Sequence, residues 1–218
     1  MLTALPQGLR TLFISFESDR APPPGLRPAC KYLKSLTVAN FGQHIASSVV
    51  TALLNRSRQT LRSFAMRNVD SDSLFLISHR AFGRSLRSLD IGVESLDDHM
   101  LYPAFFASTT SLVSLTLDAF PLRQIAKALV KLPKPTLTRL RFPVNGADYS
   151  HSDSRSFQQV EKIILLPSLK NLKRLELHRS DRSAWNSEVE MKREMEVIDA
   201  WIAVWKGRGL VIHYERRL

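Results

Sequence analysis

The chain has 218 residues, 44% of them hydrophobic, and a formal net charge of +11. This length is sufficient to bury a core, and the positive charge by itself would favour nucleic acid as a partner. No apolar run approaches the roughly 20 residues that a membrane-spanning helix needs, so no membrane partner is expected. The one cysteine, Cys30, cannot form an intramolecular disulfide, which favours a reducing compartment, the cytoplasm or nucleus.

A pattern of the form Leu-x-x-Leu-x-Leu, with conservative variants, occurs seven times along the chain. Its first positions are separated by 24, 28, 25, 26, 25 and 35 residues, and a weaker eighth copy contains Leu210 and Ile212. Recurrence at this period is typical of repeat architectures. The apolar positions of the seven copies are, in chain order, Leu9, Leu12 and Ile14; Leu33, Leu36 and Val38; Leu61, Phe64 and Met66; Leu86, Leu89 and Ile91; Leu112, Leu115 and Leu117; Leu137, Leu140 and Phe142; and Leu172, Leu175 and Leu177.

Within each copy the fourth and sixth positions alternate with outward-facing residues, which predicts a short strand with one buried face. Between copies, apolar residues follow helical spacing, most clearly in the segment that begins at Pro121 and ends before Pro133. The predicted helical faces consist of Leu122, Ile125, Leu129 and Leu132; of Ile45, Val49, Ala52 and Leu53; and of Phe157, Val160 and Ile164.

One strand and one helix cannot bury their apolar faces alone, so the units must stack. Stacking predicts a single α/β solenoid over residues 1–218, with a curved parallel sheet on its concave side and helices on its convex side. Three segments depart from the unit: a proline-rich loop at 17–30, a polar loop insertion at 145–156, and a C-terminal cap at 187–214. The cap is predicted as a helix that ends at Gly207 and Gly209, followed by a strand.

These seven copies resemble leucine-rich repeats, and the irregular unit lengths and phenylalanine-rich turns are most similar to the substrate-receptor regions of fungal F-box proteins. The resemblance implies a non-enzymatic scaffold that recognises substrates for an SCF-type ubiquitin ligase. No F-box is visible, because Leu5-Pro6 is followed at once by the first copy, so a core adaptor would bind through a preceding region. At the ninth position, where Asn or Cys is usual, only Asn145 fits; we expect apolar packing at Phe41, Val69 and Phe120 instead.

Many basic residues recur at a fixed position of the repeat. Its second position is basic in five of seven copies, and stacking would align these side chains along one margin of the sheet beside a row of serines at the third position. Such a column would bind an acidic or phosphorylated protein segment, bind nucleic acid, or only solvate the strand ends. The candidate partner-binding residues are Arg10, Lys34, Arg62, Arg87, Asp90, Arg139, Arg141, Lys173 and Arg174, together with Tyr149 in the polar loop and Trp185 before the cap helix.

No catalytic residues are predicted. His99 follows Asp97-Asp98, and His151-Ser152-Asp153 contains triad-type residues, but neighbours in sequence do not supply the convergent geometry of nucleophilic catalysis. The chain has neither the cysteine pairs of a zinc site nor a glycine-rich phosphate loop. The sequence therefore predicts a binding protein without metal or cofactor.

Overall fold

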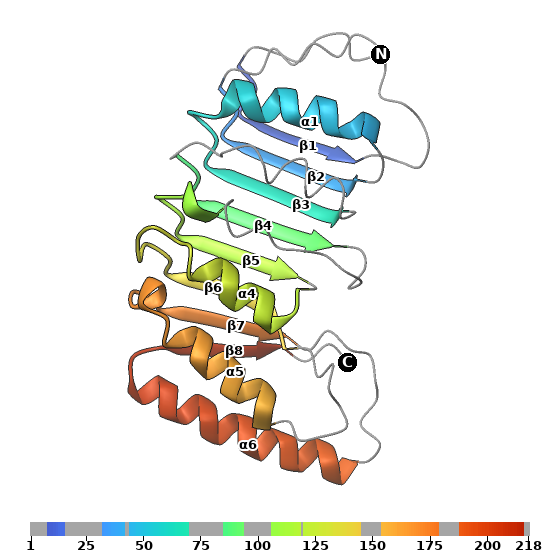
Figure 1. Ribbon diagram of the computed structural model, residues 1–218. Coiled ribbons are helices and arrows are strands. Elements are labelled where there is room, and N and C mark those ends of the chain that lie inside the picture. The colour runs from blue at the N-terminus through green and yellow to red at the C-terminus, as the bar shows by residue number, and fades with distance from the viewer. Residues whose placement is uncertain are drawn as a thin grey trace.

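The computed structural model describes residues 8–15, 32–41, 44–69, 85–93, 106–118, 120–144, 154–178 and 188–215. Over these residues the chain forms an α/β fold built on one sheet of eight parallel strands, and the strand order follows the chain order from one end to the other (Figure 1). The sheet does not close on itself. The predicted α/β class and parallel sheet are confirmed, whereas the proline-rich loop at 17–30 lies outside the described residues.

The strands coincide with the copies of the sequence pattern, and each pairs in parallel with the next along the chain. Fourth positions pair with fourth positions: Leu89, for example, lies between Phe64 and Leu115. The strands are β1 (Thr11–Ser15), β2 (Ser35–Phe41), β3 (Ser63–Val69), β4 (Ser88–Val93), β5 (Ser114–Asp118), β6 (Arg139–Pro143), β7 (Arg174–His178) and β8 (Val211–Glu215).

Apolar residues at the fourth and sixth positions make the core. From β2 to β7 each of these side chains is at most 1% exposed, whereas Leu12 and Ile14 of β1 and Tyr214 of β8 are only partly buried. The difference follows from the stacking, because an end strand is covered by a neighbour on one side only. The interior of the sheet is therefore the best-packed part of the molecule.

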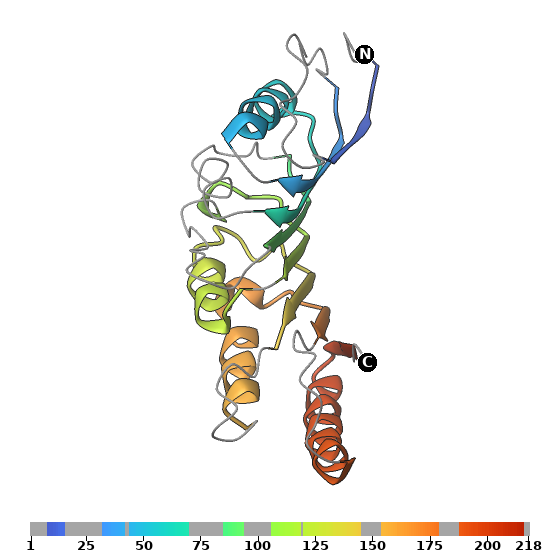
Figure 2. The same ribbon diagram turned by 90° about the vertical axis from the view of Figure 1, so that its right-hand side faces the viewer.

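The described helices are α1 (His44–Ser57), α4 (Leu122–Leu129), α5 (Ser154–Ile164) and α6 (Glu188–Gly207), with a short 3-10 helix η1 (Pro167–Leu169). Figure 2 shows α1, α4 and α5 on one side of the sheet and α6 beyond its β8 end. The opposite side carries none of the described helices, and the sheet bends so that this open face lies inside the curve (Figure 2).

The helical predictions differ in their outcomes. In α4 the expected residues Leu122, Ile125 and Leu129 are buried, and α5 buries Phe157, Val160 and Ile164 as predicted. For α1, Leu53 is buried as predicted and Ala52 is only half-buried, while Val50 and Leu54 are buried without having been predicted. The burial of Ile45 and Val49 lies outside what the structure describes. This helix is rich in apolar and small residues around its circumference, so spacing alone did not specify the face. The polar loop predicted at 145–156 is also too long, because α5 begins at Ser154.

The C-terminal cap has the predicted helix and strand. Ile198 and Trp205 of α6 are buried, and the half-buried Trp201 contacts the ring of Phe157 from α5 with ring centroids 5.4 Å apart. The helix ends at Gly207, and Gly209 in the following turn has a φ of 83°, which is accessible to glycine at little cost. The backbone N–H groups of Gly209 and Leu210 donate to the carbonyls of Lys206 and Trp205, which closes the helix end.

Candidate functional site

The second-position residues are aligned by backbone hydrogen bonds at the amino ends of the strands. The carbonyl oxygen of Arg62 accepts from the N–H groups of Arg87 and Ser88, at 2.8 and 2.9 Å. Two hydrogen bonds to one carbonyl oxygen thus link each copy to the next from β1 to β7. The same arrangement recurs at the carbonyls of Arg10, Lys34, Arg87, Val113 and Thr138.

The turns that lead into the strands lie along one side of the sheet and are rich in basic residues; they are here called the basic margin. The described parts of these turns hold ten basic residues, all exposed, and no Asp or Glu. None of the ten forms an ion pair with another described residue. Five were predicted from the second position: Arg10, Lys34, Arg62, Arg87 and Lys173. Five were not: Arg58, Lys131, Lys134, Lys170 and Arg208.

Helix ends add further positive charge beside the basic margin. The helices run back across the sheet, so their carboxyl ends lie at the same margin as the strand amino ends (Figure 1). The partial negative charge of a helix carboxyl end favours cations nearby. Each of the four described α-helices has one basic residue in its last turn: Arg56, Lys127, Lys162 and Lys206.

The open face of the sheet is made by the third, fifth and seventh positions of the strands. Across β2 to β5 this face is lined mostly by small residues, and all of these except the buried Gly92 are partly exposed. These residues are Ser35, Thr37, Ala39, Ser63, Ala65, Ser88, Gly92, Ser114 and Thr116.

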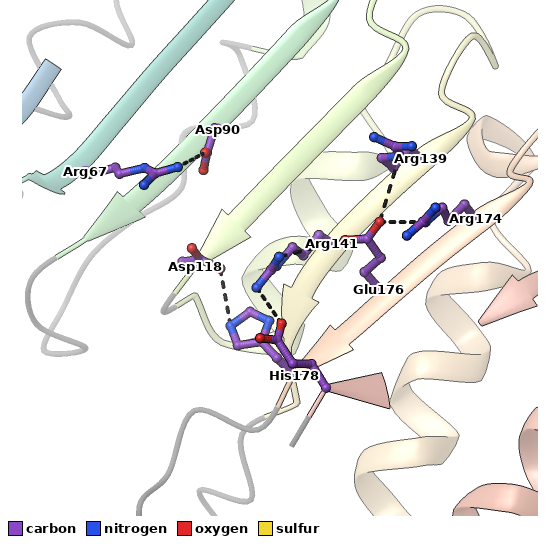
Figure 3. Close-up of polar contacts among 9 residues, drawn as sticks. Arg67, Asp90, Asp118, Arg139, Arg141, Arg174, Glu176 and His178 are labelled. Atoms are coloured by element: carbon purple, nitrogen blue, oxygen red, sulfur yellow. Dashed lines mark hydrogen bonds and ion pairs between the residues drawn. The ribbon is translucent and has the colours of Figure 1, made fainter. Parts of the chain in front are cut away.

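At the β6–β8 end the open face changes to a network of ion pairs centred on Glu176 of β7 (Figure 3). One carboxylate oxygen of Glu176 lies 2.7 Å from Nε of Arg174 and 3.9 Å from Nε of Arg139. The other lies 3.8 Å from Arg141, which also contacts Glu215 of β8 at 2.8 Å. The three predicted arginines thus come together, but two carboxylates offset most of their charge.

Asp90 lies in the middle of the open face, with its carboxylate 3.3 Å from a guanidinium nitrogen of Arg67 on the neighbouring strand β3 (Figure 3). Burial raises the pKa of Asp90, because desolvation penalises the charged carboxylate, and the nearby Asp118 acts in the same direction. Arg67 opposes the rise through its charge and its hydrogen bond. Arg141 opposes it more weakly, so Asp90 is a partly desolvated carboxyl group that is paired with Arg67.

A histidine that the sequence did not single out lies at the carboxyl edge of the sheet. Nε2 of the buried His178, on β7, is 3.3 Å from a carboxylate oxygen of Asp118 on β5. The intervening strand β6 carries Pro143 at the paired position, so the contact spans two strands (Figure 3). Asp118 and His178 both occupy the seventh position of their copies. This shared position is the sequence feature from which their proximity could have been predicted.

Hydrogen bonds between successive turns also went unpredicted. Thr60, Ser85 and Thr136 each precede the first leucine of a copy, and their hydroxyls donate to the carbonyls of Leu33, Leu61 and Leu112 at 2.9, 2.9 and 2.6 Å. A polar ladder therefore exists, but at the residue before the copy. At the ninth position Phe120 is fully buried, as expected, while Phe41 and Val69 are paired along the strands.

The two remaining predicted residues, Tyr149 and Trp185, lie outside the described residues. Within the described ranges, no group of three His, Cys, Asp or Glu side chains is placed to hold a metal ion. The same ranges contain no helix long and apolar enough to cross a bilayer. Comparison with protein-family models, with curated proteins and with solved structures gives no match.

Proposed function

We propose that this chain is a leucine-rich-repeat protein that acts as a non-enzymatic protein-interaction module, with its partner held against the open face of the sheet. The observation that supports this most is the contrast between the two faces. One is covered by α1, α4 and α5, and the other presents mostly small, partly exposed side chains to solvent. Eight strands make this face on the order of 34 Å wide, the scale of a macromolecular contact rather than of a small-molecule pocket.

The charges on the open face indicate the chemistry of the partner. Arg139, Arg141 and Arg174 are offset by Glu176 and Glu215, and Arg67 by Asp90. Paired charges of this kind contribute directional hydrogen bonds and select against mismatched partners more than they attract charge. A protein segment with mixed polar groups therefore suits this face better than a uniformly anionic polymer.

The biological setting is a separate and finer proposal. The repeat style resembles the substrate-receptor part of F-box proteins, so we propose that the bound partner is a substrate of an SCF-type ubiquitin ligase. Only the sequence resemblance supports this step, and it requires an adaptor-binding region besides the repeats. If depletion of the chain leaves the half-lives of its partners unchanged, the ligase proposal is wrong while the binding proposal stands.

Obstructing the open face tests the binding proposal. In the double variant Ala65→Arg/Thr116→Arg, two long side chains stand on the surface where only small ones lay, and partner capture is expected to be lost. Val204→Arg, at a position 57% exposed on α6, is the matched control. Proximity labelling in cells should give a set of proteins present with wild type and control and absent with the double variant. Identical sets in all three would contradict the proposal.

A further inference from the structure

The basic margin differs from the open face because its described turns contain no acidic residue. Besides its ten exposed cations, the described part of the margin carries exposed apolar side chains. Val130, directly after α4, is 57% exposed; Leu165, directly after α5, is 61% exposed; and Tyr32, before β2, is 61% exposed. Cations and exposed apolar side chains therefore occur together in these turns.

The fold brings these residues together from distant parts of the sequence. α4 and α5 contact each other, so the turns that follow them are neighbours. Lys131 and Lys134 lie in the turn after Val130, and Lys170 and Lys173 follow Leu165 before β7 begins. All these turns lie along one side of the sheet, the left side in Figure 1. Cations and exposed aliphatic side chains therefore lie together in the neighbouring turns before β6 and β7.

We propose that the basic margin binds the surface of an anionic phospholipid membrane, without spanning it. Lysine and arginine side chains are attracted to acidic headgroups, and exposed aliphatic groups gain by entering the boundary between headgroups and acyl chains. Nucleic acid fits less well, because Val130 and Leu165 have no favourable contact with a phosphodiester backbone. Proteins that bind single-stranded nucleic acid stack bases on several aromatic side chains. In the described turns only Tyr32 is an exposed aromatic side chain.

This proposal does not depend on the proposed function, since the open face takes no part in it. The sequence led to the expectation of no membrane partner because it contains no spanning segment. Peripheral binding needs no such segment: it needs cations and apolar groups on one surface, and here they come from turns more than 30 residues apart in the chain, such as those at Tyr32, Val130 and Leu165. A partner on the open face and a membrane at the margin could be bound together.

Vesicle co-sedimentation of the full chain tests the proposal, with phosphatidylcholine vesicles that contain or lack phosphatidylserine. Binding is expected only to the anionic vesicles and should weaken as salt is raised. Lys131→Glu/Lys134→Glu is expected to reduce partitioning by at least roughly 25-fold, from about fivefold for each cation lost. Val130→Ser/Leu165→Ser should also reduce it while leaving the salt dependence unchanged, because these positions carry no charge.

Two matched controls separate the margin from the remaining surface. Arg123→Glu/Lys192→Glu makes the same change in net charge at exposed helical positions outside the margin, and Val197→Ser/Val204→Ser removes two exposed aliphatic groups from α6. Both controls should bind as wild type. Equal losses in the margin and control variants would overturn the proposal, as would absence of vesicle binding at low salt. Tighter binding to single-stranded RNA than to anionic vesicles, lost in the lysine variant, would assign the margin to nucleic acid instead.

Discussion

The covered and open faces of the sheet share one backbone but are stabilised by different forces. Leu115, on the covered face of β5, is fully buried, while its neighbours Ser114 and Thr116 lie on the open face and remain partly exposed. Packing of apolar groups against the helices therefore accounts for the stability of one face. The other face is free to vary in chemistry, because its side chains have little to pack against.

The arginines show a second contrast, this time between the basic margin and the ion-pair network. Arg62 is exposed in a turn that contains no acidic residue, whereas Arg141 lies between Glu176 and Glu215. Sequence position alone treats both as members of one basic column. Arg62 has no acidic neighbour in its turn and can bind an external anion. Arg141 is already paired with two carboxylates of the protein.

The largest expected effect concerns the covered face. Leu115→Ala should lower the free energy of unfolding by roughly 2–5 kcal/mol, because it leaves a cavity between the sheet and the helices. Ser114→Ala, next to it on the open face, should change the stability by less than about 0.5 kcal/mol. Urea denaturation of both variants measures the difference. Similar losses in the two would show that the faces are not packed differently.

The covered face was predictable from the sequence because burial there follows a simple period. Leu36, Leu89 and Leu175 recur at the fourth position of the pattern, and every strand formed at its copy with fourth positions paired. The register between β3 and β4 shifts only after Met66. The exact face of α1 was not predictable, since Val49 and Val50 satisfy helical spacing equally well. The start of α5 within the expected polar loop shows a similar limit, because Ser154 and Ser156 suit a loop or a helix start.

A smaller loss is expected where the turns are joined by hydroxyls. Thr136→Ala should cost about 1 kcal/mol, because the carbonyl of Leu112, now bonded at 2.6 Å, loses its donor. Thr136→Ser keeps the hydroxyl and should retain most of the stability. If thermal unfolding shows the serine and alanine variants to be equally destabilised, the loss comes from the methyl group and not from the hydrogen bond.

The two groups of cations should respond differently to charge removal. Glu176→Gln keeps the side-chain shape but leaves Arg139 and Arg174 without their carboxylate, so the free energy of unfolding should fall by about 1 kcal/mol at low salt. The loss should shrink at high salt through screening. Arg62→Gln, in the basic margin, should cause no measurable loss. A salt-independent effect of Glu176→Gln, in denaturant titrations at both salt concentrations, would contradict the ion-pair account.

The candidate site was harder to predict than the fold, because its chemistry depends on pairs of strands. The alignment of Arg10, Lys34, Arg62 and Arg87 followed directly from the repeat. The pairing of Arg141 with Glu215, which are 74 residues apart, required the order of strands β6 to β8 and the directions of two long side chains. A sequence pattern carries the first kind of information and not the second.

The smallest expected effect is a pH dependence at Asp90. Its pKa is raised in the folded state, so the folded protein holds the carboxyl proton more tightly than the unfolded chain. The group therefore stabilises the fold below its unfolded pKa, and this contribution is lost as pH rises through the folded pKa. Asp90→Asn removes the titration, so relative to wild type the variant should gain stability as pH is raised through this range. Denaturant unfolding of both proteins across acidic to neutral pH measures the gain, and a constant difference at all pH values would show that burial does not perturb this carboxyl.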